Sequence, residues 1–172
     1  MYKRQILIPA AVRELSIPVI ASGGIATGSG LAAALALGAD AVNMGTRFMA
    51  TAEAPIHENV KNQIVANSER DTVLVFRNFH NTARVVRNEV SEQIVEIGER
   101  PGATFDDVAE LASGARGRAN VLGEGRMDDG MWWAGQTQGL IQEVDTVAAV
   151  VDKVVADAEE IMTRRLPGLV RD

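Results

Sequence analysis

The chain has 172 residues, and its 17 Lys and Arg against 23 Asp and Glu give a formal net charge of −6 at pH 7. Apolar residues make up 47% of the chain and charged residues 23%, proportions typical of folded proteins, which argues against intrinsic disorder. The acidic balance leaves no basic cluster that could follow a nucleic-acid backbone. The absence of cysteine from the sequence excludes disulfides, thiolate metal sites and cysteine nucleophiles.

The sequence also argues against a membrane partner. Its longest apolar stretch, residues 31–37, is far shorter than the roughly 20 residues that span a bilayer. The N-terminus lacks the apolar segment of a signal peptide, so we expect a cytoplasmic protein. Residues 1–5, MYKRQ, precede the first helical pattern without a cap or turn signal and are a candidate for a non-native start.

A short helix and a buried strand are predicted at the beginning of the chain. Apolar residues recur with a loose helical period over residues 6–15, and Pro18 follows. The apolar run 18–22 then stops at Gly23-Gly24, as a strand buried on both faces of a parallel sheet does.

A helix and a second strand complete a β-α-β unit. Thr27 has the side chain of an N-cap for the alanine-rich helix over 31–37, and Gly38 suits the C-terminus of that helix. Residues 40–44 then predict a second buried strand ending at Gly45. The short crossover favours two adjacent parallel strands.

Beyond Thr51 the pattern indicates a separate small lobe. The predicted elements, in chain order, are a helix over 53–66, strands over 72–76 and 83–86, helical segments over 90–97 and 105–111, and a glycine-rich loop over 113–130. The two strands suggest a hairpin. The clearest helix of the chain follows over 147–162, with Arg164 and Arg165 in its last turn.

The chemistry is expected at the two glycine turns. Gly23-Gly24 and Gly45-Thr46 end neighbouring parallel strands, so they should lie side by side at the carboxyl edge of the sheet. Glycines there let a phosphate oxygen approach free backbone amides, and Thr46 adds a hydroxyl donor. The turns therefore predict a phosphate site, and the alternative is that these glycines serve only the turn geometry.

A dinucleotide fingerprint is a second alternative, because residues 28–33 fit the pattern G-x-G-x-x-A. Such a fingerprint should follow its strand directly, and an acidic residue should end the next strand. Here the next strand ends in Met44-Gly45-Thr46 without a carboxylate, so we discount this interpretation.

Three segments resemble, in order, the nitronate monooxygenase family, formerly called 2-nitropropane dioxygenases. They are IPVIASGGIATGSGLAAALALGADAVNMGTRFMAT, FRNFHNTARVVRN and GMWWAGQTQGLI. The resemblance implies an α/β chain that is the C-terminal fragment of a flavin-binding TIM barrel. Residues 6–50 would supply strands seven and eight of the barrel, residues 51–142 an inserted α/β lobe, and residues 143–172 a helix that returns to the barrel. Barrels of this kind often bind phosphate through the loops after strands seven and eight.

The resemblance also implies a cofactor, FMN, and its contacts. The residues that would hold the FMN phosphate are Gly24, Asn43, Met44, Gly45 and Thr46, with Gly23 in support. The family more often has glutamine where Asn43 stands. Asparagine is the shorter amide, so it keeps the donor and acceptor and shifts one contact at most.

The implied activity is the oxidation of an alkyl nitronate by O₂ to a carbonyl compound and nitrite. The catalytic histidine of the family lies on earlier strands, so no catalytic residue is assigned here. A TIM barrel needs about 250 residues, which indicates a truncated chain, and a homo-oligomer stays open. The alternatives are an FMN-dependent enoyl-acyl-carrier-protein reductase, which uses a nicotinamide nucleotide, and a catalytically incomplete fragment that acts as a phosphate-binding or assembly module.

Two tryptophans and a glutamine form a second candidate cluster. Trp132 and Trp133 are predicted at a helix start, where the favoured interpretation is a packing anchor. The functional alternative is that Trp133 or Gln136 lines the substrate end of the flavin site.

The other polar candidates are interpreted as structural residues and not as catalytic or metal-binding residues. His57 and His80 are interpreted as surface histidines. The acidic residues 124, 128 and 129 lack the spacing of a calcium loop, so no metal is expected. For Arg84 and Arg87, on opposite faces of a strand, surface ion pairing suffices.

Overall fold

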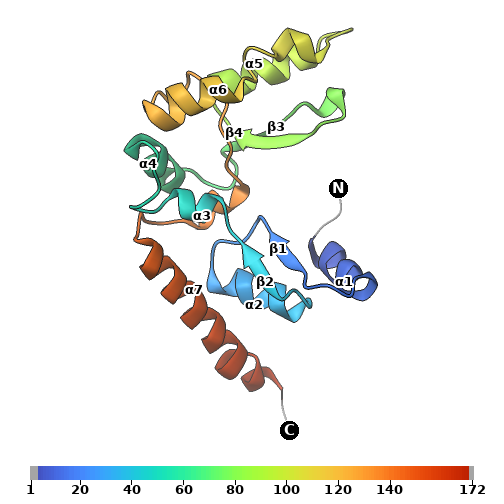
Figure 1. Cartoon of the computed structure of the whole chain (residues 1–172), viewed down its shortest axis with the longest axis vertical. Coiled ribbons are helices and arrows are strands. Elements are labelled where there is room, and N and C mark those ends of the chain that lie inside the picture. Colours follow the sequence, from blue (N-terminus) through green and yellow to red (C-terminus); the bar gives the residue numbers. More distant parts are fainter. Residues whose placement is uncertain (1–3, 171–172) are drawn as a thin grey trace.

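The computed structural model describes residues 4–170 of the chain (Figure 1). Its fold is mixed α/β, with one parallel strand pair in the lower part of the view and one antiparallel hairpin in the upper part. The lower elements are α1 (Arg4–Glu14), β1 (Ile20–Ser22), α2 (Gly28–Ala36), β2 (Ala41–Asn43) and the short α3 (Thr46–Met49). Residues 1–3 of the suggested non-native start lie outside the described residues, whereas Arg4 and Gln5 form the first turn of α1.

The predicted β-α-β unit is confirmed. Strands β1 and β2 pair in parallel, and Ser22 lies opposite Asn43. The Thr27 hydroxyl accepts a hydrogen bond of 3.3 Å from the Gly30 amide, so Thr27 is the N-cap of α2 as expected. Since both strands end at the same edge, the two glycine turns follow at neighbouring positions.

The prediction that both strands are buried on two faces is wrong for the described chain. Ala21 is buried and belongs to a core cluster with Ile8 of α1 and Ala34 of α2. Ile20, whose side chain points to the opposite face, is 61% exposed. Alternate residues of a strand point to opposite faces, and only one face of this pair is covered by helices.

The upper part contains the predicted hairpin and its covering helices. These elements are α4 (Glu58–Ala66), β3 (Thr72–Val75), β4 (Ala83–Val86), α5 (Glu89–Gly98) and the short α6 (Gly114–Arg116). The strands are antiparallel, with Leu74 opposite Arg84, and a 3-10 helix over Arg77–Phe79 lies in their connection. Helix α4 begins later than residue 53 because the His57 ring nitrogen accepts from the Asn59 amide and caps it there.

The predicted helical segment over 105–111 is only a 3-10 helix, Phe105–Val108. The predicted glycine-rich loop over 113–130 is also wrong in its first part. Helix α6 continues directly into a π-helical segment, Gly117–Gly123. A Cβ on Gly117 would collide with the Met131 carbonyl oxygen, and one on Gly130 would lie 2.9 Å from the Gly117 Cα. These glycines therefore permit close packing of the π-helical segment against residues 130–131.

The last helix, α7 (Val147–Glu160), lies along α2 in the lower part of the molecule (Figure 1). It crosses α2 at Gly28, where a Cβ would lie 2.7 Å from the Val154 carbonyl oxygen. Its N-cap is Thr146, whose hydroxyl accepts from the Ala149 amide. A π-helical segment over Ile161–Arg165 and a 3-10 helix over Pro167–Leu169 complete the described chain.

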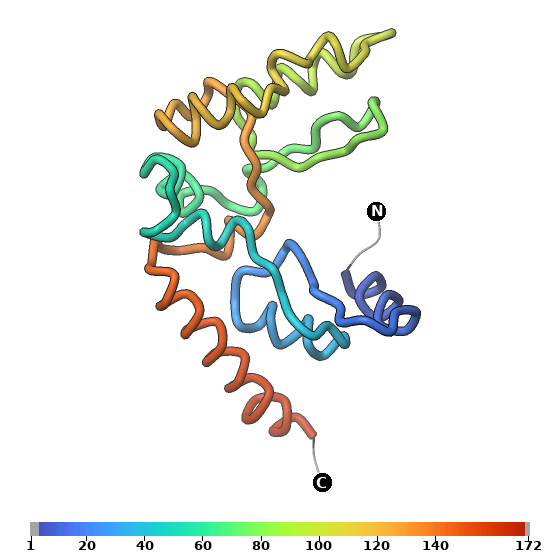
Figure 2. Tube along the Cα trace, viewed as in Figure 1, coloured from blue at the N-terminus to red at the C-terminus, as the bar shows by residue number. Residues whose placement is uncertain are grey.

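The chain passes from the lower part to the upper part after Thr51 and returns at Asp145, which lies beside Thr51. Thr51 and Asp145 form an isolated parallel bridge, and the Ala52 amide donates a bond of 2.9 Å to the Asp145 carbonyl. The Cα trace shows the segments after α3 and before α7 meeting there (Figure 2). Everything between these two residues forms the upper part of the molecule.

Candidate functional site

The first glycine turn has the backbone that its sequence predicts. Gly23 and Gly24 have φ values of +80° and +69°, a region that residues with a Cβ rarely adopt. The Gly23 amide donates to the Asn43 carbonyl at 3.2 Å, which joins this turn to the end of β2. Within residues 4–170 no protein acceptor meets the Gly24 amide, so that amide is available to a ligand.

The second turn lies beside the first. The Asn43 side-chain amide donates to the Ser22 hydroxyl at 3.2 Å. A Cβ on Gly45 would meet no atom within 4 Å, so this glycine borders open space. The Thr46 hydroxyl accepts from the Gly135 amide at 3.0 Å and keeps its own hydrogen for a ligand.

Most of the candidate cofactor residues line one cavity of about 350 Å³. The predicted residues that line it are Gly23, Gly24, Asn43, Gly45, Thr46 and Trp133. None of its lining residues carries a carboxylate. Amides, a hydroxyl group and the absence of acidic lining residues fit the phosphate end of a cofactor.

Two of the candidate residues lie elsewhere. The Met44 side chain is buried in the lower core with Ile8 and Ala21, so only the Met44 backbone could contact a ligand. Gln136 is exposed and lines a neighbouring, larger cleft of about 1050 Å³ between the lower and upper parts.

Arg4 is a residue of this site that the sequence interpretation missed. Its guanidinium lies against the first glycine turn, and a Cβ on Gly23 would lie 3.2 Å from its Nη2 atom. This cation adds positive charge where an anion is expected. The sequence gives no signal for this role, because residues 1–5 have the pattern of a candidate non-native start.

The two tryptophans have different environments, and the predicted helix start is wrong. They lie in a segment without regular secondary structure, and the next helix is a 3-10 helix beginning only at Gln136. Trp132 is 2% exposed and packs in a core cluster with Ile64 and Val121. Trp133 is 56% exposed and lines the smaller cavity. The packing interpretation therefore applies to Trp132, whereas Trp133 borders the candidate site.

The ion-pair interpretation holds for Arg87 and is wrong for Arg84. Arg87 lies 3.3 Å from Glu92. Arg84 instead donates a hydrogen bond of 2.7 Å to the Thr72 hydroxyl, and no carboxylate in the described part of the chain lies within 4.0 Å of its guanidinium. Arg84 lines both the smaller cavity and the larger cleft. Its position opposite Leu74 became visible only with the strand register.

The remaining candidates lie away from the two cavities. His80 is exposed in the hairpin connection, and half-buried His57 caps α4. Arg126 forms ion pairs with Glu124 and Asp129 of the acidic segment, which accounts for two of the three carboxylates there.

The sequence profile of the nitronate monooxygenase family matches residues 3–157. A probable nitronate monooxygenase of Staphylococcus saprophyticus is 33% identical over 159 residues, which are 92% of this chain and 43% of that protein. A (3aS,4S,5R,7aS)-5-hydroxy-7a-methyl-1-oxo-octahydro-1H-indene-4-carboxyl-CoA dehydrogenase of Rhodococcus jostii is 28% identical, over 89% of this chain and 53% of that protein.

Solved structures also resemble the chain. FabK from Thermotoga maritima superimposes with a TM-score of 0.90 at 34% identity, over 99% of this chain and 53% of that one. A nitroalkane oxidase from Streptomyces ansochromogenes gives a TM-score of 0.73 at 30% identity, over 92% of this chain and 44% of that one. The chain spans about half the length of these relatives. Over residues 4–170 there is no helix of the length and apolarity needed to cross a membrane.

Proposed function

The chain belongs to the nitronate monooxygenase family of oxidoreductase enzymes, and from this premise we propose that it forms the phosphate-binding end of an FMN-dependent nitronate monooxygenase. The reaction is the oxidation of an alkyl nitronate by O₂ to a carbonyl compound and nitrite. The single observation that carries the proposal is the pair of left-handed glycines, Gly23 and Gly24, beside the open Gly45 in one cavity.

The residues of this chain act by binding and orienting the cofactor. The Gly24 amide and the Thr46 hydroxyl would donate to phosphate oxygens, the Gly45 backbone would allow close approach, and the Asn43 side chain would hold the two turns together. Met44 would take part through its backbone only. Bound FMN supplies the electron-transfer chemistry.

The chain would be one part of a larger fold. Residues 6–50 would be the last two strand-helix units of a TIM barrel, residues 51–142 an inserted lobe, and residues 143–172 the returning helix. The bridge between Thr51 and Asp145 supports this division, because it brings together the two ends of the inserted part. The exposed face of β1 would then contact further barrel strands.

A pair of glycine variants tests the proposed function. Gly24→Val places a side chain on a left-handed residue that lines the cavity, where its Cβ would collide with the Arg4 guanidinium. Gly102→Val makes the same change at a left-handed glycine (φ +77°) with no neighbour within 4 Å of its Cβ position. We expect Gly24→Val to lose FMN and nitrite release from ethyl nitronate, while Gly102→Val keeps both. Retention of FMN and turnover by folded Gly24→Val would contradict the proposal.

A second candidate function is FMN-dependent enoyl-acyl-carrier-protein reduction. The likeness to FabK, with its TM-score of 0.90, favours it. Anaerobic addition of NADH or NADPH to the FMN-loaded protein separates the two functions. Rapid bleaching of the flavin absorbance would support the reductase and count against the monooxygenase.

A further inference from the structure

We propose that Arg84 of the β3–β4 hairpin is a ligand of the cofactor phosphate and supplies the full positive charge that the two glycine turns lack. The inference rests on the proposed function, because it takes the cavity at these turns as the phosphate end of a flavin site. It adds a residue from the upper part of the molecule to a site whose predicted phosphate ligands all come from the lower part.

The glycine turns offer uncharged donors to a group with a high charge. A phosphate monoester carries about −1.5 to −2 charges at pH 7. The donors available to it are the Gly24 amide and the Thr46 hydroxyl. Helix α3, which begins at Thr46, has only four residues, so its dipole adds little. A charged donor would strengthen binding, because hydrogen bonds between ionised groups are about twice as strong as those between neutral groups.

Arg84 is the charged residue that lines this cavity. The other lining residues within the described chain have uncharged side chains. Arg4 approaches the first turn from α1, but it is exposed and lines only the neighbouring cleft. Arg84 is half-buried and borders the cavity together with Gly24, Gly45 and Thr46. A phosphate at the two turns would therefore lie beside the Arg84 side chain.

The charge of Arg84 is not neutralised by the protein. Over residues 4–170 no carboxylate oxygen lies within 4.0 Å of its guanidinium. Glu69, which lines the adjoining cleft, lies 3.8 Å from Arg70 instead. In a chain with a net charge of −6, an arginine without a carboxylate partner creates a local positive potential that favours an anion.

Arg84 is held in position before any ligand arrives. Its Nη1 atom donates to the Thr72 hydroxyl at 2.7 Å, and Thr72 is 5% exposed. Val85, the next residue of β4, points to the opposite face and is buried with Ile94 of α5. Thr72 uses one donor of five, so the rest of the guanidinium can bind a phosphate. Because the side chain is already ordered, binding costs little conformational entropy.

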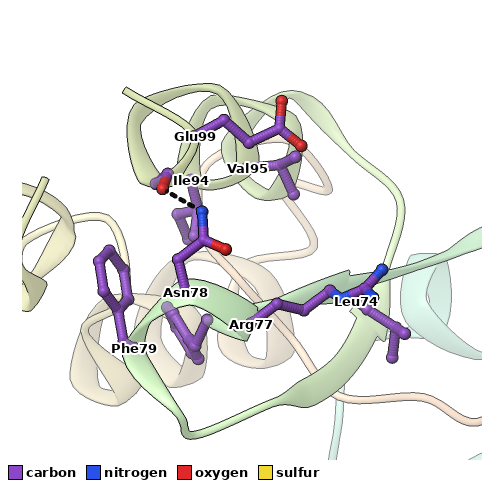
Figure 3. A pocket seen from close by; sticks show the side chains of 9 residues that line it. Leu74, Arg77, Asn78, Phe79, Ile94, Val95 and Glu99 are labelled. Carbon is purple, nitrogen blue, oxygen red and sulfur yellow. Dashed lines mark hydrogen bonds between the residues drawn. The ribbon is translucent and has the colours of Figure 1, made fainter. Parts of the chain in front are cut away.

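Arg77, in the connection of the same hairpin, provides a contrast. It also has no carboxylate oxygen within 4.0 Å in the described part of the chain. Figure 3 shows Arg77 extending alongside Leu74 and away from Phe79, in a pocket that Glu99 also lines. Arg77 borders the larger cleft but not the cavity at the glycine turns. It is therefore a matched control for the charge of Arg84.

The guanidinium group suits the phosphate in geometry as well as in charge. Its planar fork can donate two parallel hydrogen bonds to phosphate oxygens, which a lysine cannot do. With Arg84 on one side and the glycine turns on the other, the phosphate would receive donors from both parts of the molecule. The contribution of Arg84 should then be specific to the phosphate and absent for a flavin without one.

The test compares the affinities of FMN and riboflavin, which differ only in the phosphate, by quenching of the flavin fluorescence. Arg84→Gln should weaken FMN binding about 10- to 100-fold, as expected for the loss of a hydrogen bond between charged groups. The affinity for riboflavin should stay within about twofold of wild type, since riboflavin offers Arg84 no anion. Unchanged riboflavin binding also shows that the variant is folded.

Three further variants separate charge, geometry and position. Arg84→Lys keeps the charge without the planar fork, so its FMN affinity should lie between those of wild type and Arg84→Gln. Thr72→Val removes the anchor and keeps the guanidinium, so it should weaken FMN binding less than Arg84→Gln does. Arg77→Gln removes the same charge outside the cavity and should leave both affinities unchanged.

Two results would overturn the inference. Equal losses of FMN and riboflavin affinity in Arg84→Gln would show that Arg84 acts only through the fold, and unchanged FMN affinity would show that it does not bind the phosphate. A wild-type protein that binds FMN no more tightly than riboflavin would contradict the phosphate site itself, and the proposed function with it. Nitrite release is measured separately. If the variants behave as expected but the FMN-loaded wild type does not oxidise ethyl nitronate, only the proposed function is contradicted.

Discussion

The Gly135 amide donates a hydrogen bond of 3.0 Å to the hydroxyl oxygen of Thr46, 89 positions earlier in the chain. This bond joins the second glycine turn to the segment that returns from the upper part of the molecule. The candidate phosphate cavity is therefore built from both parts, because Trp133 and Gly135 line it together with the two turns.

Replacing Thr46 by Val removes a ligand donor and the acceptor of the Gly135 amide. A hydrogen bond to a charged group contributes about 1.5–3 kcal/mol, so FMN affinity should fall about 10- to 100-fold. The measurement is the dissociation constant of FMN from fluorescence quenching. Thr46→Ser keeps the hydroxyl and should bind FMN nearly as tightly as wild type, and equal affinity of all three proteins would refute the role of the hydroxyl.

Trp132 and Trp133 should contribute very differently to the stability of the fold. Trp132→Ala removes a buried side chain from the core around Ile64, and large-to-small changes of this kind cost about 3–5 kcal/mol. Trp133→Ala, at an exposed position, should change stability by less than about 0.5 kcal/mol. Urea unfolding of both variants measures this contrast. Similar losses of stability would show that the two side chains pack alike.

Arg47 should stabilise the junction between the two parts of the chain. It is 8% exposed and donates to the Ala50 carbonyl at 2.9 Å and to the Glu143 carbonyl at 3.0 Å. Burial lowers the pKa of Arg47, while the charges of Asp145 and Glu143 act in the opposite direction.

Arg47→Met leaves both carbonyls without this donor, so we expect a loss of roughly 2 kcal/mol in the free energy of unfolding. The control is Arg100→Met, which breaks an exposed pair with Glu96 and should cost about 0.3–0.5 kcal/mol. If urea denaturation gives the same midpoint for both variants, the junction does not depend on Arg47.

Asp71 should make stability depend on pH in the acid range. Its carboxylate accepts from the hydroxyl and the amide of Ser68, each at 2.7 Å, and these bonds lower the pKa of Asp71, with Arg87 adding to the effect. A carboxyl with a lowered folded pKa stabilises the protein fully above its unfolded pKa of about 3.9, and this stabilisation is lost as pH falls through the folded value.

The matching experiment compares wild type with Asp71→Asn by urea denaturation. Wild type should be more stable at pH 7, and the difference should shrink as pH falls below about 4. Asp152→Asn, at an exposed position on α7, is the control for a change in net charge. A constant difference between wild type and Asp71→Asn at every pH would contradict the assigned role.

Local sequence patterns predicted the elements that depend only on residues close together in the sequence. The parallel strands, the Thr27 cap, the hairpin and α7 follow from apolar periodicity and from single cap and turn residues. In contrast, the glycines at 117 and 130 look like loop residues, and their role depends on contact with a segment that lies close only in the folded chain. The amino-acid composition of residues 113–130 does not indicate such a contact.

The residues of the candidate site also fall into two groups, those that the sequence identified and those that only the folded chain reveals. Gly23, Gly24 and Gly45 could be identified from the sequence because glycine has no Cβ. It therefore adopts backbone conformations that other residues rarely adopt, and it leaves space for a ligand. Arg84 was not, because its two possible roles, ion pairing and lining a cleft, depend on which side chains lie across the hairpin. Trp132 and Trp133 are identical in sequence terms, and only the core around Ile64 distinguishes them.

The most direct test of the central claim is the affinity of FMN for Gly45→Val. Gly45 has a negative φ of −85° and a Cβ position with no neighbour within 4 Å, so valine should be tolerated by the fold but fill the cavity. Gly168→Val, at another glycine with no such neighbour, is the control. We predict that Gly45→Val stays folded and loses FMN while Gly168→Val binds it normally; normal FMN binding by Gly45→Val would contradict the account.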